Sequence, residues 1–83
     1  MDNLRKYLSE NTNKTFKLTK IGVKNSDSKH VQLGDKTKGG AILAGDRLVC
    51  GDIVTSVIQK VTPLVNNNFL IETTYSIYTL ENV

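Results

Sequence analysis

Short apolar segments recur along the chain after residue 14, with turn-forming residues between them. The segments span residues 15–24, 30–34, 41–44, 47–50, 53–61 and 69–80. Six of the nine residues from Ile53 to Val61 are branched at Cβ, a property that favours the pleated surface of a strand. The spacing predicts a mostly β fold, a small antiparallel β-barrel or β-sandwich of about five to seven short strands.

Local patterns refine this prediction. Within residues 15–24 the apolar positions change from even to odd numbers beside Gly22, which indicates a β-bulge. Two Gly-Asp pairs, at 45–46 and 51–52, predict tight turns between short strands. Residues 35–40 are expected to form a loop, residues 25–28 and 65–68 to form turns, and Pro63 to end a strand. Residues 69–80 alternate as one strand, whereas residues 53–61 favour a strand but also fit a helical stripe.

The N-terminus predicts a short helix over residues 1–10. Leu4, Tyr7 and Leu8 make one apolar stripe, and residues 11–13 end it. A helix this short is not stable alone in water, so it forms only if the stripe packs against another element. The 83 residues are therefore interpreted as one small β-rich domain, with residues 1–13 as helix and linker.

The residues that most catalytic and metal sites need are scarce. The chain has one cysteine and one histidine, so a zinc site with four Cys or His ligands is excluded. Gly39-Gly40 leads into an apolar run without the Lys-Ser/Thr pair of a phosphate-binding loop. A Cys50–His30 dyad lacks any supporting motif, and Cys50 lies in an apolar run typical of a packed thiol. We therefore expect no enzymatic activity, no cofactor and no metal.

Cysteine usage and hydropathy suggest where the chain acts. A single cysteine cannot form an internal disulfide, and small secreted domains usually carry several. No apolar run approaches the roughly 18–20 residues of a membrane span, so no membrane partner is expected. We therefore expect the protein to act in the cytoplasm.

Positive charge is concentrated in the middle third of the chain. Residues 14–38 contain seven lysines and two acidic residues, a balance of 7 − 2 = +5, whereas residues 39–83 contain two bases and four acids. Such asymmetry favours an acidic partner, although a solvated lysine face gives the same pattern. Candidate contacts to nucleic acid or to a partner protein are Lys17, Lys20, Lys24, Lys29, Lys36 and Lys38. A further alternative is a small anionic ligand held between subunits by Gly39, Gly40 and Arg47.

Association with other proteins is the function that the pattern favours most. Several short strands leave unpaired edges, and a second copy or a partner protein could cover them. We therefore expect a homo-oligomer and a protein partner.

The C-terminal half also carries a recognisable pair of patterns. Thr55-Ser56-Val57-Ile58 is followed after a turn by residues 72–80, with the sequence ETTYSIYTL. The pair resembles a hairpin of small uncharacterised phage and prophage proteins, in which a Thr-Ser-x-Val/Ile strand precedes one ending Thr-x-x-Ser-x-Tyr-x-Leu/Val. The resemblance spans about a third of the chain, residues 55–80. It implies a small β-barrel-like protein of a mobile element that has no catalytic residue. Such a protein would act in the cytoplasm of a bacterial host cell, where it would bind a host protein, such as a defence factor, or a nucleotide signal.

Overall fold

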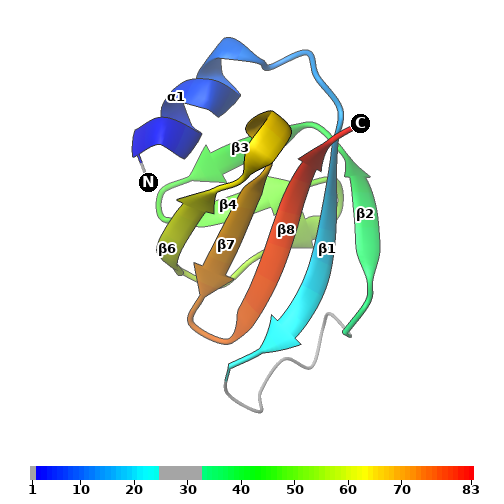
Figure 1. Cartoon of the computed structure of the whole chain (residues 1–83), viewed down its shortest axis with the longest axis vertical. Helices are drawn as coiled ribbons and strands as arrows, with labels where there is room; N and C mark the ends of the chain where they lie inside the picture. The colour runs from blue at the N-terminus through cyan, green and yellow to red at the C-terminus, as the bar shows by residue number, and fades with distance from the viewer. Residues whose placement is uncertain (1, 25–32) are drawn as a thin grey trace.

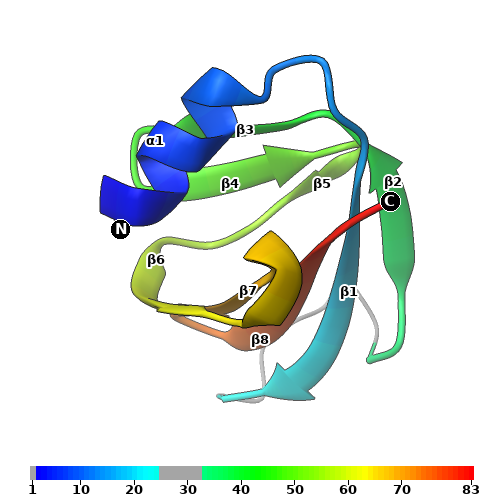
Figure 2. The same cartoon turned by 45° about the horizontal axis from the view of Figure 1, so that its top comes forward.

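The computed structural model describes residues 2–24 and 33–83 and has two antiparallel sheets with one short helix. Figure 1 shows the five-stranded sheet, in the order β2-β1-β8-β7-β6, in front of a three-stranded sheet in the order β3-β4-β5. Helix α1 lies at one end of the molecule, beside β3 (Figures 1 and 2). The mostly β prediction is confirmed. Within the described ranges no ladder joins the two sheets into a closed barrel.

The described residues form eight strands. The larger sheet contains β1 (Phe16–Val23), β2 (Lys36–Gly39), β6 (Ile58–Pro63), β7 (Phe69–Thr73) and β8 (Ser76–Asn82). The smaller sheet contains β3 (Ala41–Ala44), β4 (Arg47–Cys50) and β5 (Ile53–Val54). Helix α1 spans Asp2–Glu10, and a 3₁₀ turn, η1, spans Val65–Asn67.

Strand β1 contains the predicted bulge. Its pairing with β8 shifts between Lys20 and Gly22, so Ile21 is the extra residue. The bulge moves Val23 to the core face of the sheet, opposite Ser76, as the change of parity predicts. Ile21 and Val23 nevertheless remain exposed, because they lie at the far end of the strand.

The small sheet is built from the two predicted Gly-Asp turns. Ala44 pairs with Arg47 across the first turn, and Cys50 pairs with Ile53 across the second. Gly45 and Gly51 have φ angles of 62° and 57°. Positive φ at the first turn residue is the requirement of a type II′ hairpin turn, which glycine meets without steric cost.

The core lies between the sheets and under α1. Its apolar members are Leu4, Leu8, Phe16, Leu18, Ala41, Leu48, Cys50, Ile53, Ile58, Phe69, Ile71, Tyr78 and Leu80. Tyr7 fixes the helix to this core, with its ring 6.1 Å from the ring of Phe16 and 5.6 Å from that of Phe69. The Tyr7 hydroxyl also donates a hydrogen bond to Asn82 Oδ1 at 2.8 Å. The predicted docking of the Leu4–Tyr7–Leu8 stripe is therefore confirmed.

Three segment predictions are wrong, and they explain why the described residues form eight strands rather than five to seven. Residues 35–40 are not a loop, because residues 36–39 form β2 and pair with β1. Residues 53–61 form parts of two strands in different sheets, separated at 55–57. Residues 69–80 are not one strand but the hairpin β7–β8. The turn expected at 25–28 and most of the strand expected at 30–34 lie outside the described residues, although Leu33 and Gly34 form a turn.

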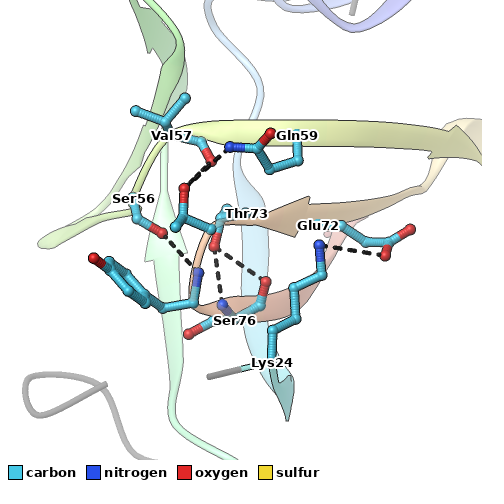
Figure 3. A network of polar contacts seen from close by, with 9 residues as sticks. Lys24, Ser56, Val57, Gln59, Glu72, Thr73 and Ser76 are labelled. Atoms are coloured by element: carbon cyan, nitrogen blue, oxygen red, sulfur yellow. Dashed lines mark hydrogen bonds and ion pairs between the residues drawn. The ribbon is translucent and has the colours of Figure 1, made fainter. Parts of the chain in front are cut away.

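The β7–β8 hairpin depends on contacts from elsewhere in the chain (Figure 3). Thr73 Oγ1 accepts a hydrogen bond from Ser76 N–H and donates one to Ser76 O, both at 3.1 Å. The turn between them is held by Val57 O, which accepts from Thr74 N–H at 3.0 Å, and by Ser56 Oγ, which accepts from Tyr75 N–H at 3.4 Å. The chain therefore turns here without glycine, asparagine or proline.

Candidate protein-binding surface

An open groove of about 220 Å³ lies between α1 and β3. It is lined by Arg5, Leu8, Ser9 and Thr12 on the helix side and by Ala41, Ile42 and Leu43 on the strand side. The groove exists because the apolar stripe of α1 packs beside β3, an edge strand of the small sheet. We call it the α1–β3 groove. Its volume is below the 300–1,000 Å³ typical of pockets for drug-sized ligands, so it fits one or two side chains of a partner.

The walls of the α1–β3 groove are apolar and its rim is polar. Leu8 and Ala41 are each 3% exposed and form its floor, while Ile42 is 56% exposed and stands at its outer wall. Among the described residues, Arg5 is the only charged one that lines it. One Nη of Arg5 donates to Gly45 O at 3.2 Å, which holds the guanidinium at the rim and leaves other N–H groups for an acceptor.

One backbone position of β3 faces away from its neighbour strand. Leu43 is opposite Leu48 in β4. The N–H of Leu48 donates to Thr55 Oγ1 at 3.0 Å, and its carbonyl accepts from Thr55 N–H at 2.9 Å, so both groups point toward β5. The N–H and C=O of Leu43 therefore point to the opposite side of β3, the side on which the groove lies.

The other edge strands are protected within the described part of the chain. Strand β2 carries Lys36 and Lys38, both exposed, and β5 is only two residues long. Strand β6 has a register shift between Ile58 and Lys60 and ends at Pro63. Lysines, bulges and proline are the devices by which natural sheets avoid edge pairing. Unpaired strand edges are therefore a weaker reason to expect association with other proteins than the sequence pattern alone indicates.

The six candidate lysines do not form one surface. Lys17, Lys36 and Lys38 lie together on the outer face of the large sheet, where Lys17 is directly opposite Lys38. Lys17 Nζ also lies 3.7 Å from Glu81, and Lys24 Nζ lies 3.7 Å from Glu72. Lys29 lies outside the described residues.

Lys20 differs from the other lysines because its side chain is inside the molecule. It is 1% exposed and shares the core face of β1 with Phe16 and Leu18. Burial lowers the pKa of its ammonium group, and the Asp35 carboxylate offsets part of that effect. Lys20 therefore cannot contact an external partner in this structure.

The proposed anion contacts do not converge within one chain. Gly39 and Gly40 lie where β2 leads into β3, and a Cβ added at Gly39 would be 3.0 Å from Gly51 Cα. Arg47 begins β4 at the other end of the β3–β4 hairpin, and its Nη1 donates to Thr55 O at 3.4 Å. Gly40 lies beside Gly51, four residues along the chain from Arg47, which is a distance of about 13 Å.

The described residues hold no group of three or more His, Cys, Asp or Glu side chains that could bind a metal ion. Cys50 is fully buried, and burial raises the pKa of its thiol, which lowers its reactivity. No helix in the described ranges is long and apolar enough to cross a membrane.

Comparisons of the chain with protein-family models, curated proteins and solved structures find no significant match. The similarity to phage proteins therefore remains a prediction from residues 55–58 and 72–80. In the structure these residues are the segment leading into β6 and the β7–β8 hairpin.

Sequence reasoning missed the groove residues Arg5, Ser9 and Thr12. The available signal was the Leu4–Leu8 stripe, which shows that the helix docks but not on which strand. The position of Arg5 at the rim follows only from the placement of α1 beside the Gly45 turn.

Proposed function

We propose that this chain is a non-enzymatic interaction protein of a phage or other mobile element that acts by binding a host protein. The observation that carries the proposal is the α1–β3 groove, an apolar recess in which Arg5 is the one charged residue that the described part of the chain contributes. Buried aromatic or aliphatic side chains in such recesses supply most of the energy of protein interfaces. The host protein is expected to insert one apolar side chain and to place a carboxylate against Arg5.

The backbone groups and side chains around the α1–β3 groove suit a protein segment as its occupant. An extended segment lying along β3 could accept from the Leu43 N–H and donate to the Leu43 carbonyl. An apolar side chain of that segment would then contact Leu8 and Ala41, while Arg5 would favour a carboxylate on the neighbouring residue of the segment. A host regulatory or defence factor is the class of partner that the phage-like hairpin implies.

The test is affinity capture from a bacterial lysate followed by titration of the captured protein. Ser9→Trp fills the groove from an exposed helix position, and Glu10→Trp places the same side chain at the next exposed position, which does not line the groove. We expect Ser9→Trp to weaken binding by about 100-fold or more, as for loss of a central anchor, and Glu10→Trp to bind as the native chain does. Equal binding by the two variants would contradict the proposal.

A second candidate function rests on the three lysines at the β1–β2 corner. Like charges placed directly opposite each other in a sheet are destabilising, yet Lys17 and Lys38 are cross-strand partners and Lys36 lies on the same face. Such a corner would bind the phosphate backbone of nucleic acid without sequence preference.

Titration of labelled single- and double-stranded oligonucleotides at increasing salt tests this candidate. Lys36→Glu with Lys38→Glu should reduce the slope of log affinity against log salt by about two, whereas Lys6→Glu on α1 should leave it nearly unchanged. Absence of binding at about 100 mM salt would remove nucleic acid as a ligand.

A further inference from the structure

The two ends of the α1–β3 groove differ in charge, so the groove can distinguish the two directions of an extended segment. Helix α1 runs antiparallel to β3 (Figure 1), and Arg5 donates to Gly45 O at 3.2 Å, just beyond the C-terminal end of β3. Leu8 and Ala41, each 3% exposed, lie beside the strand itself. A ligand therefore meets positive charge where β3 ends and apolar surface alongside β3.

Strand β3 determines which residue of an extended segment points into the groove. Leu43 directs its N–H and C=O to the groove side, and its side chain packs against the core, opposite the buried Leu48. In an antiparallel pair, one residue exchanges both hydrogen bonds with the residue opposite it, and the two side chains lie on the same face. The segment residue opposite Leu43 thus points its side chain toward Leu8. We call this residue the anchor.

The side chain that meets Arg5 lies two residues from the anchor. Residues two apart on a strand share one face and are separated by about 7 Å. Counted toward the C-terminal end of β3, this position is opposite Gly45, whose carbonyl accepts from Arg5. The other N–H groups of that guanidinium remain available for a carboxylate. Because the segment is antiparallel to β3, the acidic residue precedes the anchor in the segment's sequence.

We propose that the α1–β3 groove binds an extended segment antiparallel to β3, with an acidic residue two positions before an apolar anchor. This inference rests on the proposed function and adds to it the direction and spacing of the partner's residues. A single residue satisfies both outward groups of Leu43 only in the antiparallel direction, whereas a parallel segment needs two residues for the same bonds. The residue after the anchor lies opposite Ile42 on the outer face, where isoleucine is 56% exposed, so an apolar residue fits there too.

Two synthetic peptides of identical composition test the direction. The first is acetyl-Ser-Glu-Thr-Leu-Val-Ser-amide, and the second has the reversed order, acetyl-Ser-Val-Leu-Thr-Glu-Ser-amide. NMR titration of the labelled full chain should give a dissociation constant for the first peptide on the order of 1 mM, with shifts at the methyl groups of Leu8, Ala41 and Leu43. The reversed peptide should bind at least about tenfold more weakly. Equal or tighter binding of the reversed peptide would overturn the proposal.

Methylation of single backbone nitrogens in the first peptide tests the strand pairing. The N–H of the leucine anchor donates to Leu43 O, so N-methylation there should weaken binding by at least about tenfold. The matched control is N-methylation of the preceding threonine, whose N–H points away from β3, and it should bind nearly as the unmodified peptide does. Equal loss from the two modifications would show that the segment does not pair with β3 in this register.

The outcome for the host protein separates this inference from the proposed function. If neither peptide binds while Ser9→Trp still weakens binding of the captured host protein, the groove is the binding site but takes no such segment, and only this inference fails. If Ser9→Trp leaves host binding unchanged, the proposed function fails. Groove signals that shift with chain concentration alone, without peptide, would assign the groove to a second copy and would also overturn the inference.

Discussion

Burial gives two single residues properties that differ from those of the free amino acids. Lys20 is a lysine on the core face of β1, beside Leu18. Cys50 is a thiol in the centre of the core, with Sγ 4.0 Å from Phe16 O and 3.9 Å from Gly39 O. Each property leads to a prediction that can be tested on this chain alone, without a binding protein.

Removing the Lys20 charge should change how the free energy of unfolding depends on pH. The pKa of Lys20 is lowered in the folded chain, so between that value and 10.5 the unfolded chain binds the proton and the folded chain does not. The contribution of Lys20 to the free energy of unfolding therefore rises as pH rises through this window. The free energy of unfolding of Lys20→Met, relative to that of the native chain, should therefore fall as pH rises from neutral toward 10.5.

Urea unfolding of the native chain and Lys20→Met at several pH values measures this difference. Tyr78 and Cys50, whose pKa values burial raises, titrate in both proteins and largely cancel in the comparison. A difference that is constant from pH 7 to the alkaline limit would contradict the prediction.

Cys50 should be protected from thiol reagents. Its pKa is raised by burial, so the thiolate that reacts is scarce in the native state. We expect labelling by a disulfide reagent at pH 8 to be much slower than in urea-unfolded chain and to accelerate in proportion to the unfolded population. Equal rates in native and unfolded protein would show that the core is open at β4.

At the scale of elements, the two Gly-Asp turns make a matched pair. Both glycines have positive φ, but a Cβ added at Gly51 would collide with Thr37 Oγ1 and lie 3.0 Å from Lys38 O, whereas one at Gly45 meets nothing within 4 Å. Gly45→Ala should cost about 1 kcal/mol from backbone strain, and Gly51→Ala about 2–3 kcal/mol because the contact with β2 must shift. Chemical denaturation of both variants measures the difference, and equal losses would contradict the close approach of the second turn to β2.

Elements were predictable where the local signal and the tertiary structure agree. Helix α1, the bulge beside Gly22 and the Gly-Asp turns follow from amphipathic spacing, parity and glycine chemistry. Strand β2 was missed because its Lys-Thr-Lys-Gly sequence has no apolar alternation and pairs with β1 at the sheet edge. The β7–β8 turn was missed because Thr74 and Tyr75 favour strands, and Ser56 and Val57 hold the turn from outside.

At the scale of the whole molecule, the lysines of residues 14–38, which are close together in the sequence, lie in different parts of the structure. Lys17, Lys36 and Lys38 share a corner, Lys24 pairs with Glu72, and Lys20 is buried. The groove was not predictable, because it joins the helix of residues 2–10 to residues 41–43 through packing that the sequence pattern does not specify. The fold class could be derived from periodicity, whereas the candidate site required the position of α1.

The most direct test of the account is a map of the surface that the captured host protein covers. Methyl and amide NMR spectra of the labelled chain, titrated with that protein, report each residue separately. We predict shifts at the methyl groups of Leu8, Ala41 and Leu43 and at the side chain of Arg5. Unchanged groove signals, with shifts confined to Lys17, Lys36 and Lys38, would contradict the account.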